Sequence, residues 1–228
     1  MGFFSKSAAP ASPTLTAQVL SAKQAIDESG LNGQKAEVLL VLDCSGSMGD
    51  RYNNGEVQGV AERALALALN FDDDGRVPAV AFDSRCIELV EVTATNLASY
   101  VDREVVRKHR LGGGTNYAPA LAQIARKYTG RDPSVPGFCI FVTDGNCDDR
   151  SASERLVREL SVQPIFWQFV GVGSEAFTFL KKLDTLTGRK VDNAGFLEAR
   201  SLGDVTYQAL LKEFSSYPST ARRAGILQ

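Results

Sequence analysis

The sequence predicts an α/β fold with a mostly parallel central sheet, one antiparallel edge strand and helices on both faces. Three runs of strand length, 36–42, 137–143 and 164–172, are apolar at nearly every position, as strands covered on both faces are. Segments with helical spacing separate them, which is the alternation of a parallel sheet. A tight turn at Asp83 and Ser84 joins two shorter strands, which indicates one antiparallel pair. These patterns together describe a Rossmann-like three-layer sandwich.

The first third of the chain is expected to hold a helix, a strand and a second helix. Ser12 and Pro13 form a good helix start, apolar residues then recur on one helical face, and Gly30 ends the helix. The first strand, 36–42, follows. The stretch 57–71 is rich in alanine and leucine and predicts the next helix.

The middle of the chain continues with the two paired strands and two helices. We expect strands at 77–82 and 86–92, a helix from the N-cap candidate Asn96 to about Lys108, and a helix at 118–128.

The last third begins with the apolar strand 137–143. Ser151 and Glu154 have the spacing of a capping box, which predicts a helix ending at Leu160. The remaining expected elements are a strand at 164–172, a helix at 174–186, a short strand at 190–192 and a helix at 203–214.

Composition indicates one globular domain. The chain has 228 residues, of which 44% are hydrophobic and 23% charged, enough to bury a sizeable core. We expect a mobile N-terminal lead-in over residues 1–13. A single domain over 14–228 would follow, with an N-terminal helix and a C-terminal helical extension.

Several functional classes are disfavoured by the same composition. A net charge of -2 gives no general attraction to nucleic acid. No apolar run reaches the roughly 20 residues of a membrane helix, so no membrane insertion is expected. The four cysteines form no Cys-x-x-Cys pair, which argues against a zinc ribbon. The N-terminus lacks the apolar core of a secretory signal, so we expect a cytoplasmic location.

Oxygen-bearing residues gather at one edge of the predicted sheet. Three of them follow the first apolar strand directly, and another follows the strand 137–143, so both loops lie at the carboxyl ends of parallel strands. A threonine after a glycine run, just before the helix leading to that strand, can lie on the same edge. Three hydroxyls and two carboxylates, completed by water, suit an octahedral Mg²⁺. The set is Asp43, Ser45, Ser47, Thr115 and Asp144.

This set resembles the metal-ion-dependent adhesion site (MIDAS) of von Willebrand factor type A (VWA) domains, and the match is complete. In that family the two serines and either the threonine or the second aspartate contact the metal, and the other groups often act through water. A carboxylate from a partner commonly takes the open coordination position. The resemblance therefore implies that Asp43, Ser45, Ser47, Thr115 and Asp144 form a MIDAS.

Further segments resemble the branch of VWA proteins associated with bacterial tellurite resistance and stress response, the TerF-like branch. The similarity extends from about Leu15 to the end of the chain. The segments that carry it are 71–75, 113–119, 193–196, 211–214 and 224–227.

The first functional hypothesis is a metal-dependent protein-interaction module that is not an enzyme. Hydroxyl ligands are neutral, so a cation held by two carboxylates keeps an affinity for an outside anion. We expect Mg²⁺, with Ca²⁺ or Mn²⁺ as alternatives, and a protein partner that supplies an acidic residue. The resemblance places this module in a bacterial tellurite-resistance or stress-response system. No redox centre that could process tellurite is visible.

The alternative hypothesis is a Mg²⁺-dependent phosphatase of the haloacid dehalogenase type. Such enzymes also place an aspartate after an apolar strand, so Asp43 would be the nucleophile and 143–146 the later metal loop. Ser45, however, stands where the general acid carboxylate should be. A hydroxyl cannot protonate a leaving group at neutral pH as a carboxylic acid does.

Other patterns have simpler interpretations. The glycine run before Thr115 lacks the lysine of a phosphate-binding P-loop. The acidic run 72–74 is interpreted as a solvated turn rather than a second cation site. His109 lies in a basic, solvated stretch, and Cys44 and Cys147 are interpreted as independent thiols rather than a redox pair.

Two tyrosines lie in the site loops. Tyr52 and Tyr117 are therefore candidates for exposed aromatic residues on a partner-binding surface.

Overall fold

The computed structural model describes residues 13–71, 74–128, 132–145 and 147–228. The predicted lead-in therefore lies outside the described residues except for Pro13, which is the first residue of helix α1 (Pro13–Glu28). No helix in the described ranges combines the length and the apolar character that crossing a bilayer requires.

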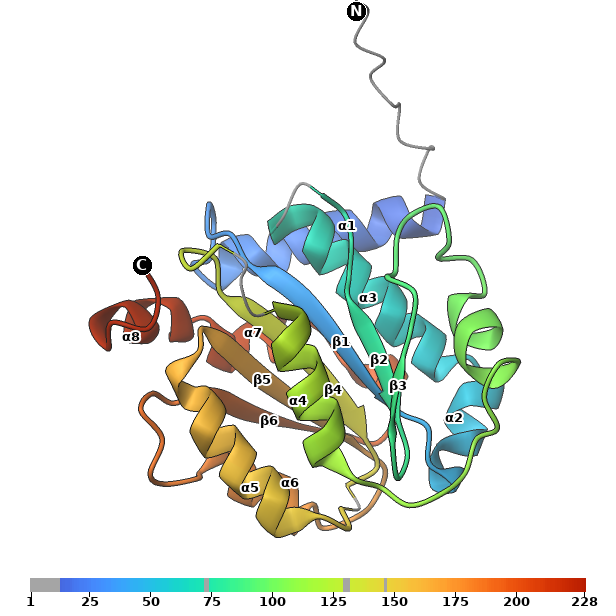
Figure 1. Cartoon of the computed structure of the whole chain (residues 1–228). Helices are drawn as coiled ribbons and strands as arrows, with labels where there is room; N and C mark the ends of the chain where they lie inside the picture. Colours follow the sequence, from blue (N-terminus) through green and yellow to red (C-terminus); the bar gives the residue numbers. More distant parts are fainter. Residues whose placement is uncertain (1–12, 72–73, 129–131, 146) are drawn as a thin grey trace, which may run out of the picture.

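The centre of the fold is one sheet in the strand order β3-β2-β1-β4-β5-β6 (Figure 1). All neighbouring strands are parallel except β2 and β3, which pair antiparallel at one edge. This confirms the predicted sheet and its antiparallel edge strand. The strands are β1 (Glu37–Asp43), β2 (Ala79–Phe82), β3 (Cys86–Glu88), β4 (Gly137–Thr143), β5 (Ile165–Val172) and β6 (Ala194–Ala199).

Helices cover both faces of the sheet, which makes three layers (Figure 1). A hydrophobic core lies on each face of the sheet, and successive residues of β1 alternate between the two cores. Leu40 and Leu42 pack toward α1, α3 and α7, whereas Leu39 and Val41 pack toward α4, α5 and α6. This alternation follows from the two-residue period of a strand and explains why β1 is apolar throughout. The other major helices are α3 (Glu56–Phe71), α4 (Tyr117–Tyr128), α5 (Arg150–Glu159), α6 (Thr178–Asp184) and α7 (Tyr207–Phe214).

Short helical segments complete the fold. Two of them lie directly after β1, where the chain carries the buried side chains Met48 and Tyr52. The segments are η1 (Gly46–Met48), α2 (Gly49–Asn53), η3 (Leu160–Val162), η4 (Leu202–Asp204) and α8 (Tyr217–Arg223).

The predicted strand at 190–192 is wrong. The strand at this point of the chain is β6, which pairs in register with β5 from Trp167 opposite Ala194 to Val172 opposite Ala199. Alanine and glycine have low strand propensity, so the local pattern of β6 is weak. Residues 194–199 form a strand because their backbone pairs with β5, despite their low propensity.

Two predicted helices are shorter in the structure because a residue has a positive φ. Phe177, with φ of 49°, precedes α6, so the helix does not extend back to residue 174. Ser99 has φ of 51°, and the helical turn that follows it includes the π-helical segment η2 (Asp102–Val106). Asn96 does not cap a helix. Its Oδ1 accepts a hydrogen bond from the amide of Thr93, which closes a turn.

The predicted capping box at Ser151 is also wrong. Helix α5 begins at Arg150, so Ser151 lies inside its first turn and Asp149 is the N-cap residue. The Asp149 carboxylate caps no amide of α5; it accepts from the amides of Tyr117 and Ala118 at the start of helix α4 and from the hydroxyl of Ser153.

Candidate metal centre

Asp43 is the last residue of β1 and its carboxylate is fully buried. Its Oδ1 accepts a 2.8 Å hydrogen bond from the amide of Ser45, and its Oδ2 accepts a 2.7 Å hydrogen bond from the hydroxyl of Thr143. The loop turns back at this point, and the hydroxyls of Ser45 and Ser47 lie 3.2 Å apart. Three of the predicted ligands therefore form one connected group at the end of β1.

Burial raises the pKa of Asp43 to about 6, against the opposing effect of the hydrogen bonds from Ser45 and Thr143. The negative charge of Asp144 raises it further, which places the two carboxylates close enough to repel each other. Two repelling buried carboxylates favour a cation between them.

Asp144 follows β4 and is 5% exposed. Its Oδ1 is buried and accepts no hydrogen bond from any of the described residues. A buried carboxylate oxygen without a donor is costly, and a bound cation satisfies it. The donor set therefore fits a divalent metal ion.

Thr115 is held by two neighbouring loops. Its amide donates a 2.7 Å hydrogen bond to Asp148, and its carbonyl accepts one of 2.9 Å from the amide of Asp148. At the start of the same loop, the amide of Gly112 donates to the carbonyl of Cys44, beside the first two ligands. The backbone thus brings the Thr115 loop to the sheet edge of Asp43, as predicted, and the Thr115 side chain is buried.

The glycine run before Thr115 allows a close approach of loops. A Cβ on Gly114 would lie 2.6 Å from Oδ2 of Asp148 and 3.1 Å from Oγ of Ser84. The amide of Gly114 also donates a 2.8 Å hydrogen bond to that Ser84 hydroxyl. The run therefore positions Thr115 between two loops.

Asp149 fixes the start of helix α4. Its carboxylate accepts hydrogen bonds from the amides of Tyr117 and Ala118 at 2.9 and 3.0 Å, and from the hydroxyl of Ser153 at 2.8 Å. An acidic side chain at a helix N-terminus satisfies amides that lack partners within the helix. Asp148 and Asp149 together anchor both sides of Thr115, and sequence analysis had not singled them out.

Tyr52 and Tyr117 do not form an exposed aromatic surface, because both are buried. The Tyr52 hydroxyl donates a 2.9 Å hydrogen bond to the carbonyl of Asp43. The Tyr117 hydroxyl lies 3.1 Å from the hydroxyl of Thr143. Both tyrosines support the site from within the protein.

Thr143 is the most important residue that sequence analysis missed at this site. It is buried, is the last residue of β4, and joins Asp43 to Tyr117 through hydrogen bonds. A threonine at the end of an apolar run looks like an ordinary strand residue. Its role depends on pairing with a strand 100 positions away.

The cysteines agree with the simpler interpretation. Cys44 and Cys147 are both free, and burial raises the pKa of each thiol to about 12. The Sγ of Cys44 donates to the Phe82 carbonyl, and the Sγ of Cys147 donates to the Asp149 carboxylate. In the run 72–74, residues 72 and 73 lie outside the described residues. Asp74 accepts from the amide of Arg76, as in a turn.

The sheet order is that of a Rossmann-like α/β domain, with oxygen-bearing side chains at the carboxyl ends of β1 and β4. A family model described as the vWA domain found in the TerF C terminus matches residues 35–227. The chain therefore belongs to the vWA-TerF-like family.

Two curated proteins illustrate the range of sequence similarity. The chain is 38% identical over 222 residues to the uncharacterised protein YcbR of Bacillus subtilis (strain 168), covering 94% of this chain and 90% of that protein. It is 28% identical over 158 residues to cuticlin-6 of Caenorhabditis elegans, covering 68% of this chain but 26% of that longer protein.

Solved structures share the fold at low sequence identity. Proximal thread matrix protein 1 from the mussel byssus, in the structure described as having a zinc-occupied MIDAS motif, has a TM-score of 0.58 at 17% identity. That match covers 81% of this chain and 48% of the mussel protein. Manganese-loaded TRAP protein of Plasmodium vivax has a TM-score of 0.55 at 18% identity, covering 80% of this chain and 74% of TRAP.

BatB of Bacteroides thetaiotaomicron has a TM-score of 0.54 at 16% identity and covers 82% of this chain and 99% of BatB. At such identities the three structures establish the fold of this chain.

Proposed function

We propose that this protein is a metal-dependent docking module rather than an enzyme. A divalent cation, Mg²⁺ in the first instance, is held by Asp43, Ser45, Ser47, Thr115 and Asp144. The cation in turn accepts an acidic side chain from a protein partner. One observation carries the proposal. The buried Oδ1 of Asp144 accepts no hydrogen bond from the described residues, and the carboxylate of Asp43 is buried as well.

The chemistry of the donor set supports a hard cation with an open position. All five side chains offer oxygen, which suits Mg²⁺, Ca²⁺ or Mn²⁺. Among the described residues no three His, Cys, Asp or Glu side chains gather as a metal site, so the candidate site depends on its hydroxyls. The neighbours of the same fold are described as holding zinc at the MIDAS motif and manganese, which supports a divalent ion here.

The family suggests the biological setting. We propose a role in a bacterial tellurite-resistance or stress-response system, on the strength of the TerF-like domain match. The phosphatase alternative gains no support from the comparisons. The cytoplasmic location stays a prediction.

Calorimetric titration with Mg²⁺ tests the metal site directly. Asp43→Ala and Thr115→Ala should each weaken binding steeply, because a hard cation has few alternative donors in this loop set. Asp204→Ala, on an exposed part of η4, is the matched control and should bind as wild type does. If both site variants bind Mg²⁺ as tightly as the control, the proposed ligand set is wrong.

A phosphatase assay separates docking from catalysis. Wild type with Mg²⁺ should not turn over aryl phosphates above a no-protein blank. Turnover that disappears in Asp43→Asn would replace the docking proposal with the enzymatic one. A pull-down compared with and without Mg²⁺, and between wild type and the double variant Ser45→Ala/Ser47→Ala, then isolates the partner.

A further inference from the structure

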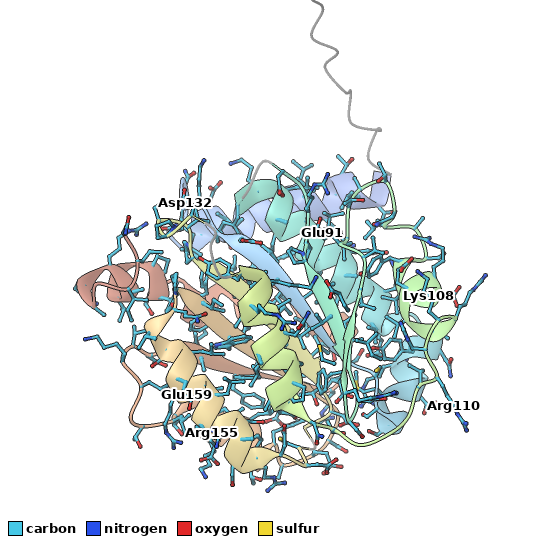
Figure 2. All side chains as sticks on the ribbon, in the orientation of Figure 1. Glu91, Lys108, Arg110, Asp132, Arg155 and Glu159 are labelled. Atoms are coloured by element: carbon cyan, nitrogen blue, oxygen red, sulfur yellow. The ribbon has the colours of Figure 1, made fainter. Side chains whose placement is uncertain are left out.

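A cleft of about 470 Å³ lies between the β2–β3 hairpin and the segment that follows η2. We call it the basic cleft. Its charged lining residues are Asp83, Arg85, Lys108 and Arg110, and His109 and Cys86 also line it. Figure 2 shows Lys108 and Arg110 projecting outward on the same side of the molecule. The two halves of the lining come from the β2–β3 turn and from the segment after η2, which are separate in sequence.

The basic cleft is joined to the metal loops through Asp83. The Asp83 carbonyl accepts a 2.9 Å hydrogen bond from the amide of Asn116, the residue after the candidate ligand Thr115. The Asp83 side chain also lies against Gly113, where an added Cβ would be 3.2 Å from its Oδ2. Asp83 therefore connects the lining of the basic cleft to the loop that carries Thr115.

Charge in the basic cleft is opposite to that of the whole protein. The lining has three cations, Arg85, Lys108 and Arg110, against one carboxylate, whereas the chain carries a net charge of -2. Such a local excess attracts anions to one place on the surface.

The cations of the basic cleft are accessible to an incoming anion. The side chain of Arg85 is 80% exposed and its pair with Asp83 is 3.6 Å long, while the half-exposed Lys108 pairs with Glu104, whose side chain is mostly buried. Within the described ranges Arg110 forms no ion pair. The exposed guanidinium of Arg85 and the side chain of Arg110 can therefore each receive a partner's carboxylate.

We propose that the basic cleft receives the continuation of the partner segment that docks at the metal, and that this segment is an acidic peptide. This proposal rests on the proposed function: one carboxylate binds the cation, and at least one further Asp or Glu lies against Arg85 and Arg110. The short cationic lining and the overall negative charge fit a peptide better than a nucleic acid, which needs a longer basic surface.

Selection from a random peptide library tests the proposal on the full chain. Selection with Mg²⁺ should enrich peptides with two or more carboxylates, and their binding should be lost in EDTA. A synthetic enriched peptide should bind Arg85→Ala/Arg110→Ala roughly 2- to 30-fold more weakly, as removal of two exposed charge contacts predicts. Arg155→Ala, on α5, is the matched control and should leave the affinity unchanged.

Direct Mg²⁺ titration of the same variants separates the two proposals. Arg85→Ala/Arg110→Ala should bind Mg²⁺ as wild type does, because neither residue is a ligand. If Mg²⁺-dependent peptides carry one carboxylate and bind the double variant normally, the basic cleft proposal fails while docking stands. If Mg²⁺ binds but no Mg²⁺-dependent peptide is enriched, both docking proposals fail. A labelled single-stranded oligonucleotide that binds wild type but not the double variant would assign the cleft to nucleic acid instead.

Discussion

The hydroxyl of Thr143, at the end of β4, donates a 2.7 Å hydrogen bond to Oδ2 of Asp43, at the end of β1. The two residues follow the last paired positions of these parallel strands, Leu42 and Val142. The sheet itself therefore fixes the orientation of the Asp43 carboxylate. This contact ties the fold to the candidate metal site.

Thr143→Val should weaken Mg²⁺ binding by about 10- to 100-fold, because a residue that orients a ligand affects affinity nearly as a ligand does. Thr143→Ser keeps the hydroxyl and should bind within a few-fold of wild type. Calorimetric titration of the three proteins measures both effects. Equal affinities for Val and Ser would show that the hydrogen bond does not position Asp43.

Asp149→Ala should destabilise the protein by about 1–3 kcal/mol, since two amides of α4 and the hydroxyl of Ser153 lose a charged acceptor. Urea unfolding in the presence of EDTA measures this loss without metal binding. Asp149→Asn retains an acceptor oxygen, so its free energy of unfolding should fall less than that of Asp149→Ala. If Asp149→Ala unfolds at the wild-type urea concentration, the carboxylate does not hold the start of α4.

Gly114→Ala should lower Mg²⁺ affinity by at least about tenfold while the protein stays folded. The new Cβ would lie 2.6 Å from Oδ2 of Asp148, which displaces the carboxylate that accepts a hydrogen bond from the amide of Thr115. Gly49→Ala is the matched control, because a Cβ there meets no atom within 4 Å. Titration and circular dichroism of both variants check the prediction. Normal affinity in Gly114→Ala would mean that the loop tolerates the shift.

The sheet and the edge that carries the candidate ligands could be predicted because their sequence patterns are local. The apolar runs that became β1, β4 and β5 reflect burial on both faces, and a parallel sheet then brings Asp43 and Asp144 to one edge. β6 could not be found in this way, because Ala194 and Gly195 join the sheet through pairing with β5 rather than through propensity.

The support of the site could not be predicted because it consists of long-range contacts between common residue types. Thr143 reaches Asp43 across 100 positions, and Asp149 reaches Tyr117 across 32. No spacing rule connects such pairs. The basic cleft could not be predicted for the same reason, because Arg85 and Arg110 come together only when two loops fold against each other.

A second carboxylate pair lies away from the metal centre, between α6 and α7. Burial, and then the negative charge of Asp184, raise the pKa of Glu213 from its ordinary 4.5 to about 7. Burial likewise raises the pKa of Asp184. The backbone of Phe196, in β6, also donates a hydrogen bond to Glu213. The pair links the sheet edge to both helices.

Glu213→Gln should flatten the pH dependence of stability between about pH 5 and pH 8. The folded protein holds a proton on Glu213 that the unfolded chain has already released above pH 4.5. Wild type therefore loses free energy of unfolding as the pH rises through about 7. The glutamine variant has no such proton to lose, so relative to wild type it should gain stability with rising pH. Urea unfolding at several pH values measures this difference, with the exposed Glu175→Gln as control. Parallel curves for wild type and Glu213→Gln would show that Glu213 ionises alike in the folded and unfolded chains.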